Sequence, residues 1–168
     1  LKDHYEPTCV ELYRDLQGKV QWKHSDLRPL NKFPIKPADD KLAPICIYEH
    51  PIPNAPNFTY TIGIDPISSE DSNDKVVSLF SISVYKRMIS PLDHFKNQVV
   101  ATYAWRPKEL VETHEMALML AEYYNAIEGV LPEASESSIF QYFFLKKKGH
   151  YLANSFDLVT EINRKTSF

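Results

Sequence analysis

An apolar run of this 168-residue chain ends abruptly in an aspartate. Residues 60–64 read Tyr-Thr-Ile-Gly-Ile, and Asp65 follows them before a proline and a polar loop. A carboxylate at the end of a strand can hold a divalent cation, because hard cations such as Mg²⁺ prefer oxygen ligands. The segment therefore predicts a metal ligand at Asp65, with an Asp-Pro turn as the purely structural alternative.

A second carboxylate, Glu133, stands in a similar position. It follows residues 130–132, which can form a short strand, and it precedes a helix predicted over 136–148. If that strand runs parallel to the one ending at Asp65 and beside it, the carboxyl ends of both strands reach the same edge of the sheet. Two acidic side chains far apart in the sequence are then expected to meet in space.

The second half of the chain predicts the elements that must position these carboxylates. Period-two patterns predict three strands over about 58–65, 76–87 and 99–105, joined by hairpin-length connections. A helix is expected from Arg106-Pro107 to about Asn125, with a stripe of apolar residues along it. The order of three antiparallel strands, a crossover helix and a parallel fourth strand predicts an α/β mixed sheet of the ribonuclease-H-like kind.

The first part of the chain has a different pattern. Thr8 and Glu11 have the spacing of a capping box, which predicts a short helix that continues through Leu16 and ends at Gly18. A strand is expected to follow at about 19–23. The N-terminal part is thus predicted to begin with a helix.

Proline then limits what the chain can form. Seven prolines fall between residues 28 and 57, a density that excludes long helices and leaves space for one short strand at 45–49. We therefore divide the chain into a helix and proline-rich N-terminal extension, residues 1–57, and a core, residues 58–168.

Composition narrows the class of protein. A net charge of −3 argues against a broad basic face for nonspecific nucleic-acid binding. The two cysteines, Cys9 and Cys46, are too few for a disulfide scaffold and lack the spacing of a zinc site. No apolar run has the length of a membrane span and no secretory signal is apparent, so a soluble intracellular protein without a membrane partner is expected.

Several segments resemble the carboxy-terminal nuclease domain of the large terminase subunits of tailed bacteriophages. Residues 45–51 resemble the segment leading into that domain, 60–66 its first strand and leading aspartate, and 99–107 its third strand and Arg-Pro helix start. Further similarity is carried by 121–126, before the family's catalytic glutamate, and after it by Tyr142-Phe143, Lys146 and Leu152-Ala153. The segments keep the family's order over nearly the whole chain.

The resemblance implies a metal-dependent endonuclease that cuts concatemeric double-stranded DNA during phage DNA packaging. Its two-metal chemistry uses clustered carboxylates to hold Mg²⁺ or Mn²⁺ against a phosphate, which makes Asp65 and Glu133 the implied catalytic metal ligands. Spacing favours Glu133 over Glu128, which stands in the turn before Gly129. The implied partners are DNA, the portal and other terminase subunits, in the cytoplasm of an infected bacterium.

The sequence departs from the family in two respects. The family has a third acidic ligand well downstream, whereas only Asp157 and Glu161 follow Gly149, neither in the expected context. A GxxxxGK[ST] phosphate loop is also absent, so the packaging ATPase is not expected here. The resemblance thus implies a nuclease core truncated at its C-terminus, and two alternatives stay open: a non-catalytic module that docks on DNA or the portal, and another ribonuclease-H-like nuclease such as a resolvase.

Overall fold

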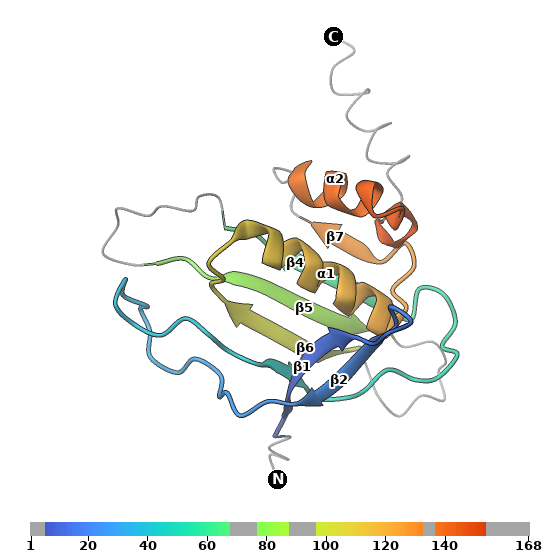
Figure 1. Cartoon of the computed structure of the whole chain (residues 1–168). Coiled ribbons are helices and arrows are strands. Elements are labelled where there is room, and N and C mark those ends of the chain that lie inside the picture. The colour runs from blue at the N-terminus through green and yellow to red at the C-terminus, as the bar shows by residue number, and fades with distance from the viewer. Residues whose placement is uncertain (1–5, 68–76, 88–96, 133–136, 154–168) are drawn as a thin grey trace.

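The structure is a computed structural model, and it describes residues 6–67, 77–87, 97–132 and 137–153. Within these ranges seven strands form one mixed sheet in the order β2-β1-β3-β6-β5-β4-β7, and two α-helices pack on it (Figure 1). The elements are β1 (Thr8–Arg14), β2 (Val20–His24), β3 (Ile45–Ile47), β4 (Tyr60–Asp65), β5 (Phe80–Lys86), β6 (Gln98–Trp105), α1 (Leu110–Tyr124), β7 (Val130–Pro132), α2 (Ser137–Leu145) and the 3₁₀ helix η1 (Gly149–Tyr151).

The predicted order of the second half is confirmed. β4 pairs antiparallel with β5, and β5 pairs antiparallel with β6. α1 then carries the chain back across the sheet, so that β7 lies parallel to β4 and next to it, with Ile62 opposite Val130. The chain is therefore an α/β protein whose mixed sheet has one parallel strand pair among mostly antiparallel ones.

The prediction of a helix near the N-terminus is wrong, because residues 8–14 form strand β1. Val10 and Leu12 are buried while Glu11 and Tyr13 are exposed, an alternation with the period of a strand. A tight turn follows, in which the Asp15 carboxylate accepts hydrogen bonds from two backbone N–H groups and Gly18 has a φ of 79°. The capping-box spacing was a chance match, and Gly18 ends a hairpin turn instead of a helix.

The N-terminal segment expected to be an extension contributes three strands to the same sheet. β1 pairs with β2 and β3, and β3 pairs with β6 through Cys46 and Thr102. The strands expected at about 19–23 and 45–49 are confirmed as β2 and β3. Together these three strands extend the sheet beyond β6.

Both α-helices cover the same face of the sheet. β4 and β5 point alternate residues, among them Ile62, Ile64 and Ile82, toward the helices and bury them. α1 closes over them at its C-terminal end, where the Tyr124 ring packs edge-on at 5.0 Å from the Tyr60 ring and its hydroxyl donates to a backbone oxygen. The largest side chains with almost no exposure are Tyr60, Tyr124, Phe80 and Phe143, followed by Ile45, Ile47, Ile62, Ile82, Leu118, Leu120, Ile139 and Val10.

α1 begins at Leu110, later than the Arg106-Pro107 start that the sequence predicts. The Arg106 N–H donates to the backbone oxygen of Lys41 at 3.1 Å, and the chain bends at Lys108 and Glu109 before the helix begins. The helix ends where Asn125 adopts a left-handed conformation with φ 50° and ψ 46°, which asparagine tolerates better than most residues.

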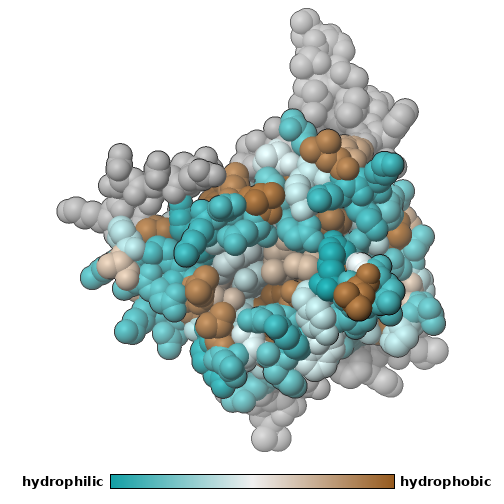
Figure 2. All heavy atoms as spheres, in the orientation of Figure 1, coloured by the Kyte–Doolittle hydropathy of each residue, from teal (hydrophilic) through white to brown (hydrophobic). Residues whose placement is uncertain are grey.

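The described residues on the helix side have their exposed apolar side chains dispersed over the surface. On the face shown in Figure 2, hydrophobic residues form small separate groups among hydrophilic ones. No helix in the described part of the chain has both the length and the apolar character needed to cross a membrane.

Candidate functional site

The opposite face of the sheet carries the predicted metal ligand. Because side chains alternate along a strand, Gly63 and Asp65 point away from the helices that bury Ile62 and Ile64. Asp65 is the last residue of β4 and is exposed. The predicted position of this carboxylate, at the carboxyl end of an interior strand, is therefore what the structure shows.

A cavity of about 530 Å³ opens beside this carboxylate. We call it the Asp65 cavity; its lining residues are Gly63, Ile64, Asp65, Ser81, Ser83, Leu131 and Pro132. It spans three strands, since Ser81 lies opposite Asp65 on β5, and Gly63 lies between Ser83 on β5 and Leu131 on β7. The cavity thus combines one carboxylate with two hydroxyl groups that can donate hydrogen bonds.

These donors fit Mg²⁺ or Mn²⁺. Hard divalent cations take carboxylate oxygens and water, and often keep several of their waters. Among the described residues, none forms an ion pair with the Asp65 carboxylate, so the charge is available to a cation. No group of three His, Cys, Asp or Glu side chains that could hold a metal occurs within the described ranges. Asp65 would therefore need at least one acidic partner from elsewhere.

The predicted partner Glu133 lies outside the described residues, as do Asp157 and Glu161. The strand before it is described, however, and Pro132 at the end of β7 lies opposite Ile64. The carboxyl ends of β4 and β7 are thus side by side. Its role as second ligand stays a prediction.

Glu128, the alternative ligand, lies at the wrong end of the strand pair. It stands in the turn before β7, is exposed, and has a φ of 53°. Its N–H donates to the backbone oxygen of His150, and the neighbouring Gly129 oxygen accepts from the Ile62 N–H. Because β7 runs parallel to β4, Glu128 is level with the start of β4, roughly 16 Å along the strand from Asp65. One cation cannot bind both carboxylates.

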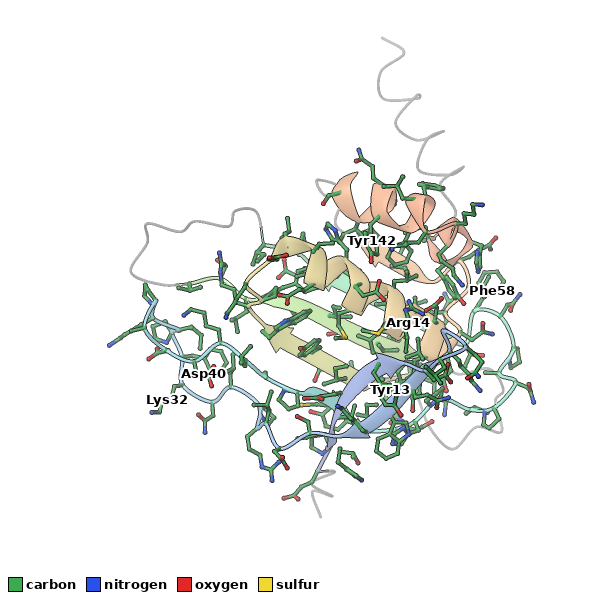
Figure 3. The ribbon with its side chains drawn as sticks, in the orientation of Figure 1. Tyr13, Arg14, Lys32, Asp40, Phe58 and Tyr142 are labelled. Carbon is green, nitrogen blue, oxygen red and sulfur yellow. The ribbon has the colours of Figure 1, made fainter. Side chains whose placement is uncertain are left out.

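A second polar cluster, on the helix side, was not predicted. The Arg14 guanidinium of β1 lies 2.9 Å from a Glu115 oxygen and 2.5 Å from a Glu122 oxygen, both on α1. Lys148 lies 2.9 Å from the other Glu122 oxygen, and the Tyr142 hydroxyl of α2 donates to Glu115. We call these five residues the Arg14 network. Figure 3 shows Arg14 and Tyr142 converging on α1 from opposite sides.

The Arg14 network fixes the two helices and the N-terminal hairpin relative to one another. Arg14 and Lys148, which both pair with Glu122, are 134 positions apart in the sequence. No local pattern reveals such a cluster, because each residue alone has the sequence context of an ordinary surface charge. It supports the sheet from the side opposite the Asp65 cavity.

The Arg14 network predicts a loss of stability at alkaline pH. Burial, together with the hydrogen bond to Glu115, raises the pKa of Tyr142 from 10.0 to about 12. The folded protein therefore favours the protonated phenol of Tyr142. The stability that this phenol contributes is fully present below pH 10.0 and is lost as the pH rises to about 12. We expect Tyr142→Phe to flatten the fall in urea midpoint over this range. An unchanged pH profile in that variant would show that other groups cause the fall.

Comparison with known proteins finds no matching family model, no similar curated protein and no similar solved structure. The geometry of the Asp65 cavity and the order of the sheet are therefore the features that bear on function.

Proposed function

We propose that this chain is the nuclease core of a phage DNA-packaging terminase, with a ribonuclease-H-like fold, and that it hydrolyses phosphodiester bonds of double-stranded DNA with the help of Mg²⁺ or Mn²⁺. The observation that carries the proposal is the Asp65 carboxylate. It stands exposed in a cavity at the carboxyl end of β4, beside the end of the parallel strand β7.

The order of the sheet supports the fold assignment. Ribonuclease-H-like sheets place three antiparallel strands first and then add parallel strands beside the first one. Here β6, β5 and β4 are the antiparallel three, and β7 is the first parallel addition. After α2 the chain returns to β7, where Leu152 forms a parallel bridge with Val130 and the Ala153 N–H donates to the Val130 oxygen. A second parallel position therefore begins on the far side of β7.

The metal ligands of the proposal are Asp65 and Glu133. Divalent ions supply charge neutralisation at the phosphate and an activated water when they are bound. The chain's own contribution is to fix the Asp65 carboxylate at a strand end, where the paired neighbours hold the backbone on both sides. The hydroxyls of Ser81 and Ser83 can donate hydrogen bonds to oxygens of a ligand in the Asp65 cavity.

Nicking of supercoiled plasmid tests the proposal directly. We expect conversion to the open circle with Mn²⁺ or Mg²⁺ and none after chelation. If the protein binds the plasmid but does not cut it, and calorimetry detects no Mn²⁺ binding, a docking module would be favoured instead. Faster cutting of branched DNA or of an RNA–DNA hybrid than of linear duplex would indicate another ribonuclease-H-like enzyme.

A further inference from the structure

Gly63 is the glycine on which the described residues place no constraint. Gly18 has a φ of +79°, a Cβ at Gly129 would lie 2.5 Å from the Tyr60 backbone oxygen, and one at Gly149 would lie 2.6 Å from the exposed Phe144 ring, which would have to turn aside. Within the described part of the chain, a Cβ built on Gly63 meets nothing within 4 Å, and the φ of Gly63 lies outside the left-handed region. An L-residue side chain would fit there without a clash against these described residues.

Glycine inside a strand still lowers stability, by about 0.5–1 kcal/mol relative to alanine. It usually marks a bulge, a tight bend, or a place where a ligand or another backbone comes close. A bulge is excluded, because Gly63 keeps regular register with Ser83 on one side and Leu131 on the other. The irregularity of β5 falls between Val84 and Tyr85 instead. Regular pairing on both sides leaves the close approach of a ligand or of another backbone, and the open space beside Gly63 favours a ligand.

The missing side chain would project into the Asp65 cavity. Gly63 and Asp65 are two residues apart on one strand, so they share a face, and both line the cavity. The depression of about 530 Å³ is wide open to solvent and has room for a group larger than a cation. The hydroxyls of Ser81 and Ser83 suit a ligand rich in acceptor oxygens, and an anion can lie beside Asp65 only if a cation compensates the two negative charges.

We propose that the space over Gly63 receives a phosphate group of the bound DNA strand, in contact with the strand backbone and next to the cation held at Asp65. The inference rests on the proposed function and names the residue that admits the substrate. Gly63 is thus a positioning residue, because it sets how close the phosphate comes to the carboxylate. Any side chain there would hold the phosphate away by about the width of a methyl group.

The test replaces Gly63 with alanine and with valine in the full chain. Both variants are expected to keep or raise the thermal midpoint, since alanine and valine suit a strand better than glycine does. Affinity for a fluorescein-labelled duplex in Mn²⁺ is expected to fall at least about tenfold in Gly63→Ala and further in Gly63→Val, with a matching loss of nicking. Mn²⁺ affinity without DNA, measured by calorimetry, is expected to stay within about twofold.

Two variants serve as controls. Thr61→Ile enlarges a side chain on the same face of β4, outside the Asp65 cavity, and should leave DNA affinity unchanged. Gly129→Ala should lower the thermal midpoint, because its Cβ would strike the Tyr60 oxygen.

The outcomes separate this inference from the proposed function. If Gly63→Ala binds and nicks DNA like the wild type while Asp65→Ala does neither, the role of Gly63 is refuted and the nuclease stands. If Gly63→Ala loses stability, the fold requires the glycine and the inference is equally refuted. If the wild type binds neither Mn²⁺ nor DNA, both proposals fail together.

Discussion

Asp65→Asn abolishes most of the metal-dependent nicking, by a factor of at least about a hundred, and leaves the protein folded. This is the expected result because the amide keeps the shape of the side chain but loses the negative charge that attracts a divalent cation. Loss of a residue that merely supports a metal ligand already costs about 10–100-fold, so loss of the ligand itself should cost no less. Asp65 is exposed at a strand end, where a substitution changes stability by only about 0.5 kcal/mol.

The measurement is the initial rate of plasmid nicking over a range of Mn²⁺ concentrations, beside the circular dichroism spectrum of each variant. A loss of metal affinity shifts the rate curve to higher Mn²⁺, so part of the activity of Asp65→Asn should return at high concentration. Nicking by Asp65→Asn at the wild-type rate throughout would remove the basis of the proposed function.

Glu128→Gln is the matched control. It removes the same charge from an exposed carboxylate in the turn before the neighbouring strand, at the end remote from Asp65. We expect no change in nicking, because one cation cannot reach both side chains. Glu133→Gln should resemble Asp65→Asn, and equal losses in both variants would support a shared metal.

Local patterns in the sequence were sufficient to predict the elements that carry this site. β4 and β5 alternate buried apolar residues with smaller or polar ones over six and seven residues, so their period is clear. The parallel placement of β7 followed from the general rule for crossover connections, since α1 leaves little other freedom. As a result Asp65 and the end of β7 could be predicted to lie at one edge of the sheet.

The N-terminal part could not be predicted in the same way. Thr8 and Glu11 satisfy the capping-box spacing. The structure is decided instead by the burial of Val10 and Leu12 on one face of β1, which pairs with β2 in a hairpin. The alternation of buried and exposed residues stabilises β1 only when β1 pairs with β3, and the paired residues are more than 30 positions apart in the sequence. A pattern of four residues holds no information about such pairing.

The role proposed for Gly63 could not be predicted from the sequence, for a different reason. In the sequence this glycine resembles any other turn or strand glycine, and its neighbours give no reason to single it out. The two glycines differ in the space around a Cβ built on them: the described residues leave it open at Gly63, whereas at Gly129 the Tyr60 backbone oxygen occupies it. The sequence therefore predicted the Asp65 carboxylate of the site but not the open space over Gly63 beside it.

The Arg14 network leads to the prediction with the largest expected effect on stability. Arg14→Met should lower the free energy of unfolding by about 2–3 kcal/mol, because it leaves a carboxylate oxygen inside the protein without its cation. The Glu122 side chain is only 12% exposed, and its Oε2 atom is buried against the Arg14 guanidinium. The Arg14 Nη1 atom at 2.5 Å is what compensates its charge, while Lys148 compensates the other oxygen at 2.9 Å.

Lys23→Met is the control for Arg14→Met, since each variant removes a cation of the same hairpin that is paired with a carboxylate. Lys23 lies 3.3 Å from Glu11, and the two side chains are 61% and 48% exposed, so solvent screens the pair. Its loss should cost less than about 0.5 kcal/mol in urea unfolding. The double variant Arg14→Met/Glu122→Met should recover part of the loss of Arg14→Met, because no buried carboxylate remains. Equal losses in Arg14→Met and Lys23→Met would show that the network contributes no more than a surface ion pair.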